Sequence, residues 1–132
     1  MPIIAPDSAD TASLALLSTI RTIQSRPPIG CPWTHERTPR DFIAFTRSEL
    51  EEIEEALECL DRSQSSSESA KSYFRRELTD ELGDLLWDAV KLVGLCARDH
   101  GISEAAPWRA AAVVAAVGEW KLDRSRCWDG SK

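Results

Sequence analysis

The segment SELEEIEEALECL, residues 48–60, places six glutamates among thirteen residues, and it decides how this chain folds. On a helical wheel at about 100° per residue, one stripe begins with two phenylalanines and continues into this segment: Phe42, Phe45, Glu49, Glu52 and Ala56. Spacings of three and four residues are typical of the buried side of a helix. The remaining glutamates point broadly the other way, toward the expected solvent side: Glu51, Glu54, Glu55 and Glu58. Two carboxylates are therefore expected where the pattern calls for apolar residues.

A second acidic flank lies downstream, beside a stripe that is expected to be apolar core. The flank consists of Glu77, Glu81, Asp84 and Asp88. The stripe consists of Leu78, Leu82, Leu85, Ala89, Leu92 and Cys96. Like charges at this spacing repel each other, and a partly buried carboxylate cluster is costly unless a cation neutralises it. Because Mg²⁺ prefers oxygen ligands, the two flanks predict a site for a hard divalent cation. The alternative is that both flanks face water.

The composition limits the class of protein. The chain has 132 residues, of which 42 % are hydrophobic and 29 % charged, and its net charge is −6. This is a soluble composition with enough residues for one domain, and the acidic balance argues against nucleic-acid binding through a basic face. The sequence shows neither a signal-peptide pattern nor an apolar run long enough to span a membrane. We therefore expect a cytoplasmic protein with free thiols and no membrane partner.

Helical periodicity predicts an all-α fold with four main helices and no sheet. The expected helices cover about 8–25, 38 or 39 to 61, 70–99, and 103 or 107 to 122. Thr38 is the expected N-cap with Pro39 in the first helical position, and Gly101 is the expected left-handed C-cap. A serine-rich connector covers about 62–69 and an irregular tail about 123–132. Residues 1–132 are thus interpreted as a single helical domain, a four-helix-type bundle.

Three motifs carry a family resemblance in their order and spacing: GCPWTHERT at 30–38, SELEEIEEAL at 48–57 and ELTDELGDLLWDAVKL at 77–92. Together they resemble the MazG-like branch of the all-α nucleoside triphosphate pyrophosphohydrolases, over about residues 14–128. In such families an E-x-x-E pair and an E-x-x-D pair hold Mg²⁺ and are catalytic. The matching positions here are Glu49, Glu52, Glu81 and Asp84.

The resemblance implies a hydrolase that is a homodimer or homotetramer and depends on Mg²⁺, with Mn²⁺ able to take its place. The implied reaction is (d)NTP and water to (d)NMP and pyrophosphate, with a role in nucleotide-pool house-cleaning. Two alternatives stay open. One is a dUTPase-like, dCTPase-like or phosphoribosyl-ATP pyrophosphohydrolase of the same superfamily. The other is a non-catalytic helical module that senses nucleotides or binds a partner.

The chain departs from the family pattern at several positions. Ser48 occupies the first position of E-E-x-x-E when the spacing from Trp33 is kept. A second frame, at residues 51–55, would place Glu55 on the solvent side and is rejected for that reason. His35 stands where the family tends to have lysine, and Lys91 stands where many members have asparagine.

Five residues are candidates for substrate contact: Trp33, Asp88, Lys91, Lys121 and Arg124. The basic residues are suited to contact phosphate. Lys121 and Arg124 resemble the K-x-x-R-R motif with which the bundle ends in the family. Each of the three is also compatible with an ordinary surface charge. Trp33 is expected either to stack on a base or to plug the end of the bundle. Asp88 is expected either to support the metal ligands or to contact the sugar.

Overall fold

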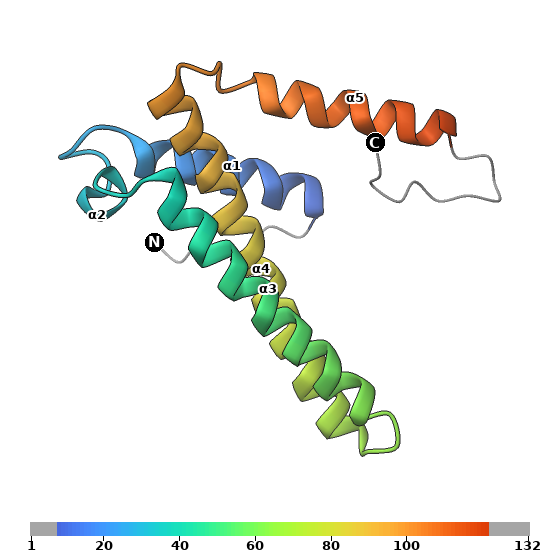
Figure 1. Cartoon of the computed structure of the whole chain (residues 1–132). Helices are drawn as coiled ribbons and strands as arrows, with labels where there is room; N and C mark the ends of the chain where they lie inside the picture. The colour runs from blue at the N-terminus through green and yellow to red at the C-terminus, as the bar shows by residue number, and fades with distance from the viewer. Residues whose placement is uncertain (1–7, 122–132) are drawn as a thin grey trace. The chain divides into compact units, whose positions relative to one another are not determined.

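The described part of the protein is entirely helical. The computed structural model describes residues 8–121, with side chains as far as Val114. In this range it contains no strand and five helices (Figure 1): α1 (Ala9–Gln24), α2 (Pro32–His35), α3 (Pro39–Arg62), α4 (Glu68–His100) and α5 (Ala106–Lys121). The expected all-α class is confirmed. The short α2 was not expected, because four residues are too few for a helical period to show.

The chain divides into two units. The first ends at Leu95 and holds α1, α2, α3 and most of α4, while the second begins at Cys96 and holds the end of α4 and α5. Within the first unit, α3 and α4 run side by side in opposite directions as a long hairpin (Figure 1). The serine-rich connector joins them over residues 63–67. No helix in the described range is both long and apolar enough to cross a membrane.

Local capping signals set the ends of the two hairpin helices. The Thr38 N–H donates to the Asp41 carboxylate at 2.8 Å, and the Asp41 N–H donates to the Thr38 hydroxyl at 3.3 Å. This reciprocal capping box satisfies two backbone donors, and Pro39 follows in the first helical position. At the C-terminal end of α4, Gly101 follows directly with a φ of 64°. The residue at which α3 begins also fixes the side of the helix from which Glu49 projects.

Few apolar side chains are buried. Among the described residues the buried hydrophobic ones are Ile20, Phe42, Ala56 and Leu95. An aromatic cluster joins α2 to the first half of α3. The ring centroids of Phe42 and Phe45 are 5.2 Å apart, and those of Trp33 and Phe42 are 6.2 Å apart. This small core holds the end of the hairpin next to α2.

The side of α4 that faces α3 is not the expected apolar stripe. The buried residues of α4 are Asp88, Lys91 and Leu95, which continue the acidic flank. Leu82, expected in the core, is 43 % exposed, and Leu86 is 59 % exposed. The prediction for Leu82 is therefore wrong. The periodicity identifies an apolar stripe correctly but cannot tell which neighbouring surface that stripe will meet.

Replacing Thr38 by alanine should lower the free energy of unfolding by about 1 kcal/mol, because that is the usual cost of removing a capping hydroxyl. Urea denaturation followed by circular dichroism measures the loss. Thr79→Ala is the control, since the exposed Thr79 hydroxyl only donates back to the Arg75 carbonyl within α4, at 2.8 Å. The control should change stability by less than about 0.5 kcal/mol. Equal losses in the two variants would contradict the importance of the capping box.

Candidate metal centre

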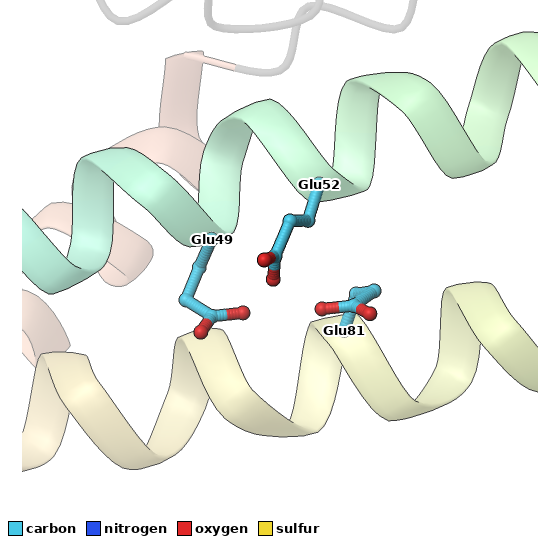
Figure 2. A group of neighbouring side chains, drawn as sticks. All are labelled: Glu49, Glu52 and Glu81. Atoms are coloured by element: carbon cyan, nitrogen blue, oxygen red, sulfur yellow. The ribbon is translucent and has the colours of Figure 1, made fainter.

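Three carboxylates converge across the α3–α4 hairpin. Glu49 and Glu52 project from α3, and Glu81 projects toward them from α4 (Figure 2). One carboxylate oxygen of each residue lies within 4.8 Å of the other two. A spacing of three residues puts Glu49 and Glu52 on one face of α3. The structure thus brings together three of the four acids that the sequence selected, and we call them the glutamate triad.

Asp84, the fourth expected ligand, is not a member of the triad. It is exposed and lies about one turn of α4 beyond Glu81. Its negative charge nevertheless contributes to raising the pKa of Glu49 and of Glu81. Asp84 is therefore close enough to act on the triad electrostatically. Ser48 and Glu51 are exposed and outside the triad.

The triad contains buried oxygens that lack partners. Oε2 of Glu49 and Oε2 of Glu81 are buried and accept no hydrogen bond within the described part of the chain. Leaving a buried carboxylate oxygen without a donor or a cation is costly. The ion pairs at Glu68 and at Asp99 lie elsewhere, and no ion pair joins the triad to a basic side chain among the described residues.

The electrostatics of the triad follow from burial and crowding. Burial raises the pKa of Glu49 to about 7, and the charges of Glu52 and Asp84 push it in the same direction. The pKa of Glu81 is raised first by its hydrogen bond with Glu52 and then by burial. Without a cation, Glu49 therefore binds a proton near neutral pH more readily than an exposed glutamate does.

A cavity of about 370 Å³ adjoins the triad between α3 and α4, and Glu52 and Glu81 form part of its wall. Tyr73 and Phe74 line it from α4, with ring centroids 5.4 Å apart. Sequence reasoning did not select these two aromatic residues. The only available signal was an aromatic pair one turn before Glu77, which is equally typical of an ordinary core.

Asp88 and Lys91 continue from the triad along the buried side of α4. Burial raises the pKa of the Asp88 carboxyl. Lys91 is 3 % exposed, so the interpretation of Lys91 as a surface charge is wrong. Its Nζ lies 4.8 Å from the ring centroid of Phe42, 4.8 Å from that of Trp87 and 5.3 Å from that of Trp33. Sequence reasoning missed Trp87, which stands one turn before Lys91 and encloses its ammonium group.

Trp33 packs at the end of the hairpin and also stays accessible. Its ring stacks on Phe45 at a centroid distance of 6.0 Å, and the Arg37 guanidinium lies 4.5 Å from its centroid. It is nevertheless 47 % exposed. The other two candidates for substrate contact fall outside the described side chains: Lys121 ends α5, and Arg124 lies beyond the described residues.

Comparison with known proteins assigns the hairpin to a family. The model of the MazG nucleotide pyrophosphohydrolase domain matches residues 37–106, slightly more than half of the chain. The chain belongs to the MazG family. The match includes all of α3 and α4, and hence the glutamate triad, Asp84 and Lys91 of this MazG chain. Family membership supports nucleotide pyrophosphohydrolase activity in general.

One curated relative has no described activity. It is an uncharacterized 26.1 kDa protein in the blaB 3' region of Streptomyces cacaoi, 31 % identical over 85 residues. The alignment covers 64 % of this MazG chain and 29 % of the relative, so the chain spans less than a third of that protein's length. No solved structure matches the chain.

Replacing Glu49 by glutamine should stabilise the cation-free protein more at about pH 8 than at about pH 5. The pKa of Glu49 is about 7 in the folded protein, above its value in the unfolded chain. Proton binding therefore stabilises the folded state fully below the unfolded pKa, and this contribution is lost as the pH rises through about 7. A glutamine stays neutral at every pH, so the variant does not lose this stability as the pH rises.

Thermal denaturation in a buffer with a chelator measures this difference at the two pH values. Glu51→Gln is the control, because it removes one charge from the exposed side of the same helix. If both variants gained the same stability at about pH 8, the destabilisation would come from the total charge of α3 and not from repulsion within the triad.

Proposed function

We propose that this chain is a Mg²⁺-dependent nucleoside triphosphate pyrophosphohydrolase that converts (d)NTP and water to (d)NMP and pyrophosphate. We further propose a role in nucleotide-pool house-cleaning. The observation that carries the reaction is the glutamate triad, with two buried carboxylate oxygens that have no partner among the described residues. Membership of the MazG family supports the same class of reaction.

The residues present fit a hard divalent cation. Glu49, Glu52 and Glu81 offer carboxylate oxygens from two helices, and Asp84 is the proposed fourth ligand. Mg²⁺ and Mn²⁺ both favour such oxygen ligands. When bound, the cation offsets the negative charge of the phosphate oxygens during hydrolysis.

The chain's own residues contribute in three ways. The triad gives up its proton when a cation binds, so cation affinity should rise with pH. Without a cation, its negative charge repels an anionic substrate. Trp33, which is 47 % exposed, is the proposed contact for a base. Lys121 and Arg124 are the proposed phosphate contacts, and Asp88 and Lys91 occupy the turns of α4 that lead from the triad toward Trp33.

Replacing Glu81 by glutamine should lower pyrophosphate release by more than about 100-fold, because losing a metal ligand should cost at least as much as losing a residue that supports one. The assay is pyrophosphate production from a full panel of NTPs and dNTPs with Mg²⁺, and again with a chelator. Glu58→Gln, on the exposed side of α3, is the matched control and should keep its activity. The melting temperature of the Glu81 variant in cation-free buffer should not fall.

The products decide between the remaining interpretations. Diphosphate and orthophosphate would contradict cleavage between the α and β phosphates. A strong preference for dUTP, dCTP or phosphoribosyl-ATP in the same assay would favour the corresponding enzyme of the superfamily. No turnover of any of these substrates with Mg²⁺ or Mn²⁺ would favour a non-catalytic module.

We also infer that the protein is a homo-oligomer, with a homodimer favoured over a homotetramer. Ile43, Leu50 and Leu57 stand seven residues apart on α3, and each is at least 36 % exposed. Leu82 and Leu86 are exposed on α4. With so few buried apolar residues in the described part of the chain, such a stripe is suited to burial against a second copy.

Replacing Leu50 by lysine should therefore shift the protein toward the monomer. A charged side chain in the centre of an apolar interface is costly to bury. Light scattering after size-exclusion chromatography at micromolar concentration measures the mass. Leu14→Lys is the control, since Leu14 is 68 % exposed on α1 and lies outside this stripe. A monomeric wild-type protein would contradict the inference.

A further inference from the structure

Lys91 is a buried lysine at the end of the hairpin where Trp33 packs. It is 3 % exposed, and its side chain makes no ion pair or hydrogen bond within the described part of the chain. Burial lowers the pKa of its amine. A buried ammonium group without an anion is costly unless other groups stabilise it. Burial also leaves the amine little surface for a direct contact with phosphate.

Three aromatic rings from three helices enclose this amine. Nζ of Lys91 lies 4.8 Å from the ring centroid of Phe42 on α3, 4.8 Å from that of Trp87 on α4 and 5.3 Å from that of Trp33 on α2. All three distances fall within the range of about 6 Å over which a ring attracts a cation. Because the attraction acts on both partners, the amine also holds the rings around it.

Trp33 depends on such contacts, because its own helix is too short to fix its position. α2 has four residues, and an isolated helix of that length is unstable in water. The Trp33 ring stacks on Phe45 of α3, with 6.0 Å between the centroids. The Arg37 guanidinium lies 4.5 Å from the same ring, but it comes from the segment that directly follows α2. Lys91 connects the ring to α4.

The turn of α4 that carries Lys91 is itself held in place. The Gln24 side-chain amide, at the end of α1, donates to the Lys91 carbonyl at 3.0 Å. Gly94 follows one residue short of a full turn later, and a methyl group there would overlap the Gln24 amide. Lys91 and Glu81 share α4 and lie about 15 Å apart along its axis. One helix therefore carries both the amine that contacts Trp33 and a carboxylate of the triad.

We propose that Lys91 is a positioning residue: its amine fixes the Trp33 ring relative to the glutamate triad and does not itself contact the substrate. The inference rests on the proposed function, in which Trp33 contacts the base and the triad holds the cation. A triphosphate must reach both at once, so a displaced ring weakens the binding of the whole substrate. The reacting phosphates at the triad are not affected. Loss of the amine should therefore raise KM and leave kcat nearly unchanged.

The first test looks for the contact in the wild-type protein without any substrate. The ε-methylene protons of lysine are observed by NMR in the full chain after isotope labelling of its lysines. Protons over ring faces resonate upfield, so the Lys91 signal should lie upfield of that of Lys71, which pairs with Glu68. Trp33→Leu should move the Lys91 signal part of the way back. A Lys91 signal at the position of the Lys71 signal would overturn the proposal.

The second test separates positioning from packing. Lys91→Met replaces the amine by an apolar chain, and replacing a buried charge in this way is often neutral or stabilising. The melting temperature should therefore not fall. KM for a triphosphate should rise about fivefold, the effect of losing one ordinary cation–π contact, while kcat should stay within about twofold.

Lys71→Met is the matched control, because it also removes a lysine charge from α4, and it should change neither constant. An unchanged KM in folded Lys91→Met, or a loss confined to kcat, would overturn the positioning role. If Lys91→Met does not fold, the Lys91 signal in the wild type and its return in Trp33→Leu decide instead.

The third test asks whether Lys91 acts through Trp33. In Trp33→Leu the ring is absent, so adding Lys91→Met should raise KM no further. The same rise in KM with and without the ring would show that Lys91 does not act through Trp33, and it would overturn the proposal.

Failure of the proposed function gives a different result from failure of this inference. If the chain binds a triphosphate but does not hydrolyse it, the dissociation constant takes the place of KM and only the pyrophosphohydrolase proposal fails. If the chain hydrolyses triphosphates and Lys91→Met behaves like the wild type, only the positioning role fails. A chain that binds no triphosphate with Mg²⁺ or Mn²⁺ would overturn both.

Discussion

Repulsion among the carboxylates of Glu49, Glu52 and Glu81 is the constraint on which the rest of the structure depends. This repulsion opposes the close approach of α3 and α4 unless part of the negative charge is neutralised. Burial raises the pKa of Glu49 to about 7, so proton binding by Glu49 offsets part of this charge near neutral pH. Under the proposed function a cation replaces the protons. The same contact thus opposes the cation-free fold and, under the proposed function, is the contact that holds the cation.

The hairpin buries a few of its polar groups and exposes several of its leucines. Asp88 and Lys91 of α4 are buried, whereas Leu50 and Leu82 are exposed. This is the reverse of what a helix in an isolated small domain does. It explains why so few apolar residues are buried in the described part of the chain. It also connects the site to the proposed oligomer, because a charged groove between two helices needs stabilising contacts elsewhere.

Two chemically different sites follow one another along this hairpin. The triad is a group of hard carboxylate oxygens with no basic side chain paired to it in the part of the chain that the structure describes. Several turns along α4, Lys91 carries a buried amine enclosed by three aromatic rings, and burial lowers its pKa. Asp88 lies between them and acts electrostatically on both. Along α4, the charged groups on this side of the hairpin thus change from acidic at the triad to basic at Lys91, near Trp33.

The sequence by itself determined the features that depend on neighbours within one helical turn. The capping box at Thr38 and the shared face of Glu49 and Glu52 follow from residues three positions apart, and the left-handed Gly101 follows from the missing side chain of glycine. The tertiary structure decided which distant groups meet. It brought Glu81 but not Asp84 into the triad, turned an expected core stripe partly outward, and enclosed a lysine with rings from α2, α3 and α4. The physical reason is that helical periodicity reports which side of a helix is polar or apolar, whereas contacts between helices depend on how those sides pack against one another.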